Sequence, residues 1–162
     1  MILRPEEAGD APAVRALTVA AFVGMQEADL VEALRASGDA VLSLVAEERG
    51  AILGHVLFSR LVAPAASLAL APVSVHPDRQ RQGIGSRLIV SGLEQVRQGG
   101  WDAVFVLGEP AYYGRFGFSK DMAAGFATAY PRDYFMGLEL RPGILSGLRG
   151  EVVYPAPFGA LD

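Results

Sequence analysis

Residues 73–88 read Val73-Ser-Val-His-Pro-Asp-Arg-Gln-Arg-Gln-Gly-Ile-Gly-Ser-Arg-Leu88, a strand-like run followed by a polar loop and the start of an amphipathic helix. Pro77 ends the strand, because proline cannot continue a central ladder. Gly83 and Gly85 stand where the helix begins, and neither carries a Cβ that would keep an anion away from the backbone. The first N–H groups of a helix lack internal partners, and the helix dipole makes that end partly positive. The segment therefore predicts a backbone cradle for a phosphate group.

Two common phosphate-binding motifs do not fit this segment. A P-loop requires Gly-Lys followed by Ser or Thr, and Gly85-Ser86-Arg87 lacks the lysine. A dinucleotide-binding fingerprint requires glycine where Leu88 stands, and it places its glycines directly after a strand, whereas Pro77 intervenes here. The pattern that does fit is Gln80-Arg-Gln-Gly-Ile-Gly85, of the form Gln/Arg-x-x-Gly-x-Gly/Ala.

On both sides of this segment, residue patterns predict alternating strands and helices in one α/β domain that spans residues 1–162. We expect about seven strands in one mixed sheet, flanked by helices. The expected strands cover residues 1–4, 41–48, 52–61, 67–75, 101–107, 135–140 and 151–154. The expected helices cover about 10–22, 27–36, 84–98 and 109–117, with a short helical turn after Pro142.

The composition suits a packed globular domain and argues against several classes of protein. Hydrophobic residues make up 51% of the chain and charged residues 20%, as in folded proteins with a core. The formal net charge of −4 argues against a nucleic-acid binder, which needs a clustered basic excess. Without cysteine the chain has no disulfide, thiolate metal site or cysteine nucleophile, and two histidines argue against a histidine-rich metal site.

The sequence also lacks the patterns of export and membrane insertion. The N-terminus has no basic region followed by an apolar run and a cleavage site, as a signal peptide would have. No stretch reaches the roughly 18 uncharged residues that a membrane helix needs. We therefore expect a cytoplasmic protein without a membrane partner.

A second motif lies downstream, at residues 104–118, which read Val104-Phe-Val-Leu-Gly-Glu-Pro-Ala-Tyr-Tyr-Gly-Arg-Phe-Gly-Phe118. With both motifs in this order of strands and helices, the chain resembles the GNAT superfamily of acetyl-CoA-dependent N-acetyltransferases. The combination Leu-Gly-Glu-Pro-x-Tyr-Tyr-x-Arg-Phe-Gly-Phe is similar to one branch of predicted N-acetyltransferases. The resemblance covers residues 2–120 well and the remainder loosely. It implies a single-domain acyl-CoA N-acyltransferase fold.

The resemblance implies roles for residues in three places. Val73, Ser74 and Val75 match the strand whose backbone pairs with the pantetheine arm of acetyl-CoA, and the Val75 N–H is expected to polarise the thioester carbonyl. Tyr113 matches the tyrosine that protonates the departing CoA thiolate. The strands that hold Val75 and Val106 are expected to splay apart and admit the cofactor. The residues that match the pyrophosphate loop are Arg81, Gln82, Gly83, Ile84, Gly85, Ser86 and Arg87.

The chemistry also requires a base, because an amine attacks only after its ammonium form has lost a proton. Glu109 is the first candidate, because it follows the predicted strand 101–107, close to the expected thioester. Glu27 and Glu48 are the alternatives. Glu109 stands beside Pro110, so its side chain also suits a plain helix cap.

Three functions are compatible with these patterns. The first is acetyl transfer from acetyl-CoA to a primary amine of a small molecule, peptide or protein, by direct attack in a ternary complex. The second is a non-catalytic acyl-CoA-binding or sensor domain of the same fold, and the third is an interaction module that binds another phosphate ligand. Tyr113 favours the first. An acidic chain favours a cationic acceptor, and residues 123–150 are expected to shape the acceptor site. The resemblance also makes a homodimer possible.

Overall fold

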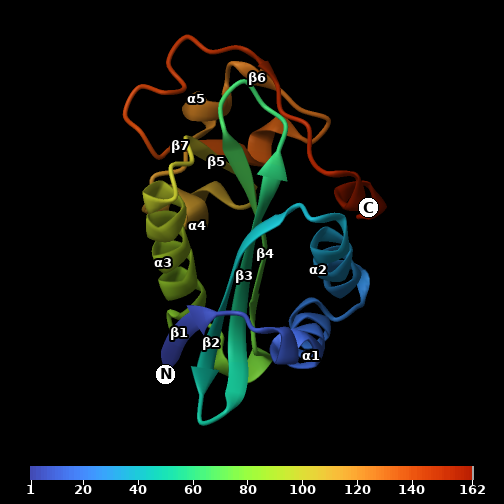
Figure 1. The fold of residues 1–162 in the computed structure, drawn as a ribbon. Coiled ribbons are helices and arrows are strands. Elements are labelled where there is room, and N and C mark those ends of the chain that lie inside the picture. The colour runs from blue at the N-terminus through green and yellow to red at the C-terminus, as the bar shows by residue number, and fades with distance from the viewer. Residues whose placement is uncertain (162) are drawn as a thin grey trace.

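A mixed six-stranded sheet forms the centre of the computed structural model, which describes residues 1–161 (Figure 1). Its strand order is β1-β2-β3-β4-β5-β7, and every neighbouring pair is antiparallel except β4 and β5. The strands are β1 (Ile2–Pro5), β2 (Ala40–Glu48), β3 (Ala51–Leu61), β4 (Ser67–Val75), β5 (Ala103–Leu107) and β7 (Phe135–Glu139).

Helices cover both faces of this sheet (Figure 1). The helices α1 (Ala11–Phe22) and α2 (Gln26–Ser37) bury their apolar sides in a core cluster on one face. The helix α3 (Ile84–Gln98) buries its apolar stripe in a second cluster on the other face. The short helices α4 (Pro110–Tyr113) and α5 (Lys120–Ala123) follow β5. The 3-10 turns are η1 (Ala8–Asp10), η2 (Pro77–Arg79), η3 (Gly114–Phe116), η4 (Arg132–Tyr134) and η5 (Ala156–Ala160).

The C-terminal quarter departs from the sequence-based expectation. The expected strand 151–154 does not join the main sheet, which has six strands instead of about seven. Instead β8 (Gly150–Glu151) pairs in parallel with β6 (Phe126–Ala127) in a separate two-stranded sheet. After β8 the chain changes partner, because Val153 exchanges backbone hydrogen bonds with Val62 instead of with the β6 segment. Residues 142–147 form consecutive hydrogen-bonded turns, at the place where a short helical turn was expected after Pro142.

The pair β4 and β5 separates after a short contact, as expected. Parallel pairing joins Ser67 to Ala103 at one end and Ala69 to Phe105 at the other, whereas β4 continues to Val75. Beyond Ala69, β4 is hydrogen-bonded only to β3 among the described strands. The β5-side edge of β4 is therefore open at the end where α3 begins.

Close contact between α3 and β3 fixes the position of the helix start. A Cβ built on Gly92 would lie 2.4 Å from Cε2 of Phe58, a distance that requires movement. Gly92→Ala should therefore lower the free energy of unfolding by about 1–2 kcal/mol, because overpacking outweighs the gain in helix propensity. Urea unfolding measures this. Gly9→Ala is the matched control, since its added Cβ meets no atom within 4 Å. A higher urea midpoint for Gly92→Ala would contradict this packing.

A buried polar cluster ties the residue after β1 to β2, β3 and α2. The Ser43 hydroxyl bonds to the Glu6 carboxylate and lies 2.7 Å from Nε2 of His55, and Arg35 pairs with Glu6. Burial favours the neutral form of Glu6, but the bonds from His55 and Ser43 and the charge of Arg35 lower its pKa below the ordinary value overall. This cluster joins α2 to the sheet.

Across residues 1–161, none of the helices combines the length and apolar character needed to cross a bilayer.

Candidate functional site

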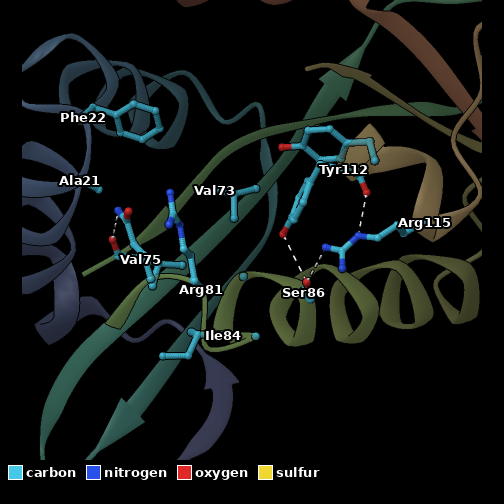
Figure 2. A pocket seen from close by; sticks show the side chains of 13 residues that line it. Ala21, Phe22, Val73, Val75, Arg81, Ile84, Ser86, Tyr112 and Arg115 are labelled. Atoms are coloured by element: carbon cyan, nitrogen blue, oxygen red, sulfur yellow. Dashed lines mark hydrogen bonds between the residues drawn. The ribbon is translucent and has the colours of Figure 1, made fainter. Parts of the chain in front are cut away.

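A cavity of about 500 Å³ lies where the open edge of β4 meets the start of α3 (Figure 2). Helix α1 borders it on one side and α4 on the other. Its lining residues are Ala21, Phe22, Val73, Val75, Gln80, Arg81, Gly83, Ile84, Gly85, Ser86, Tyr112, Tyr113 and Arg115. The charged side chains in this set, Arg81 and Arg115, are both cationic. The cavity thus combines an apolar strand edge with a positively charged helix start.

The loop before α3 presents backbone N–H groups to this cavity. Arg81 (φ +63°) and Gly83 (φ +84°) have left-handed backbone conformations, which turn successive N–H groups toward one side. Gly83 is the N-cap of α3 and provides no side-chain cap. Within residues 1–161, the N–H groups of Ile84, Gly85 and Ser86 have no hydrogen-bond acceptor. The first N–H group of this helix that has an acceptor is that of Arg87, which donates to Gly83 O. These donors are available to an anion.

The absence of a side chain at Gly85 keeps this part of the cavity open. A Cβ built there would lie 3.3 Å from the Tyr112 hydroxyl, 3.5 Å from Val75 Cγ2 and 3.7 Å from Val73 Cγ1. The backbone of α3 thus approaches both β4 and α4 closely. Any side chain at position 85 would project into the space between them.

Two side chains, Tyr112 of α4 and Arg115 of η3, contact Ser86 at the start of α3, as Figure 2 shows. The Ser86 hydroxyl lies 3.4 Å from the Tyr112 hydroxyl and accepts a bond from Arg115 at 3.1 Å. The Arg115 guanidinium also donates to Tyr112 O at 3.3 Å and lies 4.6 Å from the centre of the Tyr112 ring. Arg115 thereby brings a fixed positive charge to the end of the cavity opposite α1.

Tyr113 contributes a protonated hydroxyl to the cavity. Its ring lies against the backbone of Gly108, where an added Cβ would come within 2.3 Å of Cε2. Burial, and to a smaller extent the neighbouring Tyr112, raise the pKa of Tyr113 to about 12. Its hydroxyl therefore keeps its proton across the physiological range and acts as a hydrogen-bond donor.

The peptide groups of Val75 face the open edge of β4. The neighbouring His76 N–H donates to Leu53 O of β3 at 2.8 Å. Since successive residues of a strand alternate the direction of their peptide groups, those of Val75 point away from β3. Val75 O accepts a bond from the Gln80 side chain at 3.2 Å, which closes the loop back onto the strand.

The structure gathers most of the sequence-predicted site residues around one cavity. Those that line it are Val73, Val75, Arg81, Gly83, Ile84, Gly85, Ser86 and Tyr113. Ser74 belongs to the same strand, but its side chain is buried on the opposite face, where its hydroxyl has no hydrogen-bond partner within residues 1–161. Arg87 is exposed and does not line the cavity. The Gln82 side chain accepts a bond from Arg79 instead.

The candidate bases lie outside the cavity. Glu109 is exposed at the N-cap of α4, where its backbone oxygen accepts the N–H groups of Tyr112 and Tyr113. Glu48 pairs with Arg79 at 3.0 Å. Glu27, in the first turn of α2, is not among the lining residues. Among the lining residues that the structure describes there is no carboxylate or imidazole.

Sequence reasoning did not identify several lining residues. Ala21 and Phe22 come from the end of α1, far away in the sequence, and no local motif marks them. Arg115 does stand inside the second motif, so its charge next to the tyrosine pair was a visible signal. No group of three metal-ligating side chains occurs in the part of the chain that the structure describes.

Comparisons with known proteins agree on one family. The profile of the acetyltransferase (GNAT) domain matches residues 39–120. The chain is 34% identical over 164 residues to the uncharacterized N-acetyltransferase YhbS of Escherichia coli (strain K12), covering 98% of each chain. The crystal structure of Escherichia coli YhbS in complex with CoA superposes with a TM-score of 0.94 at 32% identity, covering 99% of this chain and 93% of the other. A GNAT family acetyltransferase from Brucella melitensis in complex with acetyl-CoA gives a TM-score of 0.82 at 39% identity, covering 97% of each chain.

Proposed function

The chain belongs to the GNAT family of acetyltransferases, and from this premise we propose that it transfers an acetyl group from acetyl-CoA to a primary amine by direct attack in a ternary complex. The observation that carries the proposal is the cavity at the open edge of β4, which joins unpartnered backbone donors to a protonated tyrosine. Each part of this cavity matches one requirement of acyl transfer.

The α3 start fits the diphosphate of coenzyme A. Three free N–H groups at residues 84–86 and the positive end of the helix dipole favour a doubly charged anion. Arg81 and Arg115 add cationic side chains at the rim. The space above Gly85, which any Cβ would reduce, fits a ligand that runs between β4 and α4. In this arrangement the backbone provides most of the binding and the arginines add charge.

The open edge of β4 fits the pantetheine arm and the thioester. Peptide groups of Val73 and Val75 point toward this edge and can pair with an extended ligand as a neighbouring strand would. The Val75 N–H is our candidate for the donor to the thioester oxygen, where negative charge develops during attack. Removing one such donor typically costs about 3–4 kcal/mol of transition-state stabilisation.

Tyr113 is our candidate for stabilising the leaving group. With a pKa near 12, the hydroxyl is a weaker acid than a thiol, whose ordinary value is about 8.5. Complete proton transfer from Tyr113 to the thiolate is therefore unfavourable, and a hydrogen bond to the developing thiolate is the role that its acidity supports. The proton that completes the thiol then comes from the attacking amine, whose nitrogen loses it on amide formation.

Glu109 is our candidate for the base. Because its carboxylate is exposed and outside the cavity lining, we propose that it accepts the ammonium proton through solvent. Direct attack needs no enzyme nucleophile, in agreement with the absence of cysteine from the sequence.

Two measurements test the proposed function. Isothermal titration should show CoA binding, and free-thiol detection should show acetyl-CoA consumption that depends on an added primary amine. Tight CoA binding without thiol release across a broad amine panel would instead favour a non-catalytic sensor. No binding of CoA or acetyl-CoA would refute the proposal.

Arg115→Gln should raise the Kd for CoA about 10-fold, because it removes a charged group that is held in place by Ser86 and Tyr112. The expected loss is largest at low salt, since the arginine is exposed. Arg60→Gln is the matched control, an exposed arginine that does not line the cavity. An equal rise in the Kd for CoA in both variants would show that Arg115 contributes only to the overall charge of the protein and makes no specific contact with the ligand.

A further inference from the structure

The loop between β4 and α3 is not fixed by regular backbone pairing. None of the backbone N–H groups of residues 80–86 has a backbone acceptor within residues 1–161. Within this loop Arg81 has a left-handed backbone (φ +63°), which is unfavourable for a residue that carries a Cβ. A conformation of this kind persists only where surrounding contacts hold it. Side chains must therefore supply the contacts that keep this loop in place.

Arg79 makes the contacts that bridge the left-handed residue. Its Nε donates to Gln82 Oε1 at 3.0 Å, so one hydrogen bond spans Arg81. Its two terminal nitrogens donate to the two carboxylate oxygens of Glu48, at 3.0 and 3.4 Å. Arg79 is half-buried, whereas the other residues from Pro77 to Gly83 are exposed. The guanidinium of Arg79 thus joins an otherwise exposed loop to the β2–β3 hairpin.

Glu48 gives this contact a well-defined base. It is the last residue of β2 and pairs with Ala51 across a two-residue turn. The turn residues Arg49 (φ +53°) and Gly50 (φ +81°) both have the positive φ that a tight hairpin turn of this kind requires. The hydrogen bond and the charge of Arg79 lower the pKa of Glu48, so its carboxylate is ionised at neutral pH. A two-pronged pair between arginine and carboxylate also fixes the direction of the guanidinium.

The loop residues that Arg79 holds lead directly into the cradle of free N–H groups. Gln82 is followed by Gly83, the N-cap of α3, and then by the unpartnered N–H groups of residues 84–86. On the other side of the loop, the Gln80 side chain donates to Val75 O at 3.2 Å and ties the loop to the edge of β4. The position of the free donors therefore depends on both ties.

From these contacts we infer that Glu48 and Arg79 are positioning residues for the cofactor, and that their ion pair holds residues 80–83 in the conformation that aims the N–H groups of residues 84–86 at the diphosphate. The inference rests on the proposed function and gives Glu48 a role other than that of the base. A cradle already held in its binding conformation loses less freedom when the ligand arrives, so its affinity is higher. Neither residue lines the cavity, so the pair should affect binding and leave acetyl transfer unchanged.

The direction of the effect of Glu48→Gln tests this role. If charge alone mattered, removing a carboxylate near an anionic ligand and releasing Arg79 would strengthen binding. If the pair positions the loop, Glu48→Gln should instead raise the Kd for CoA about 5- to 10-fold in isothermal titration. Glu94→Gln is the matched control and should keep the Kd within twofold, because Glu94 also pairs with an arginine, Arg97 at 2.9 Å, but lies far along α3 from its start. An unchanged or lower Kd for Glu48→Gln would overturn the inference.

A double-mutant cycle tests whether the two residues act through one contact. Arg79→Gln should raise the Kd for CoA at least as much as Glu48→Gln does, because it also removes the bond to Gln82. The double variant should bind CoA no more weakly than Arg79→Gln alone, since the pair is already broken in the single variant. If the two losses multiply instead, the residues act independently and the inference is wrong.

Steady-state kinetics separate positioning of the cofactor from a part in the reaction. Glu48→Gln should raise the KM for acetyl-CoA about as much as the Kd for CoA and keep kcat within twofold, as expected when only binding is weakened. A fall in kcat with an unchanged KM would contradict the positioning role. Absence of CoA binding by the wild type would refute the proposed function itself. Wild-type binding that Glu48→Gln does not weaken would refute the positioning role alone.

Discussion

Replacing Tyr113 by phenylalanine should lower kcat about 10- to 100-fold and leave the Kd for CoA within threefold. The substitution removes one hydrogen bond to a charge that develops only in the transition state, and such a bond contributes about 1.5–3 kcal/mol. The ring remains, so its contacts with Gly108, Tyr112 and Phe118 are preserved. Steady-state kinetics with thiol detection and titration with CoA measure the two quantities separately.

The pH profile of the rate distinguishes a Tyr113 hydroxyl that stays protonated from a group that ionises between about pH 6 and 10. Burial raises the pKa of its hydroxyl to about 12, so the donor form is present at every lower pH and is lost only as the pH rises through that value. Wild type and Tyr113→Phe should therefore show the same pH profile between about pH 6 and 10, differing by a constant factor. Tyr112→Phe is the matched control, because its hydroxyl faces Ser86. Parallel loss of kcat and CoA affinity in Tyr113→Phe would assign this tyrosine a structural role instead.

The cradle of free backbone N–H groups at the start of α3 was predictable from the sequence because every part of it is local. Gly83 and Gly85, the strand before them and the apolar stripe of α3 all lie within residues 73–98, so their spacing alone indicates an anion site at a helix start. The first five strands along the chain were predictable for a similar reason, since a local pattern of residues marks each of them. The predicted strands agree with the structure, and membership of the GNAT family agrees with the comparisons, whereas the binding roles of the residues at the start of α3 stay predictions.

The parts that could not be predicted depend on contacts between distant residues. Arg115 reaches the cavity through a bond to Ser86, 29 positions earlier, and Phe22 lines it only because α1 crosses β4. The prediction of a main-sheet strand at 151–154 was wrong for the same reason. Val153 forms a single bridge with Val62, and β8 pairs with β6 instead of with a strand of the main sheet. The amine acceptor, a homodimer and a cytoplasmic location stay predictions, because each depends on something outside the chain.

Gly85→Val should abolish measurable CoA binding, with a rise in Kd of at least about 100-fold. Its Cβ would lie 3.3 Å from the Tyr112 hydroxyl and its methyl groups would extend into the space between Val75 and α4. The ligand would then lose its approach to the N–H groups of residues 84–86, and the loss of two bonds to a charged group costs about 3 kcal/mol or more. Gly85→Ala should give a smaller loss in the same direction, because it adds the Cβ alone.

The control for this prediction separates lost binding from lost folding. Gln95→Val places the same β-branched side chain at an exposed position of the same helix, where it should lower stability by less than about 1 kcal/mol and leave CoA binding intact. Thermal unfolding without ligand should give similar Tm values for the two variants, and only wild type and Gln95→Val should gain stability when CoA is added. If Gly85→Val binds CoA with the affinity of wild type, the diphosphate does not lie against the start of α3, and the role of every residue around the cavity must be reassigned.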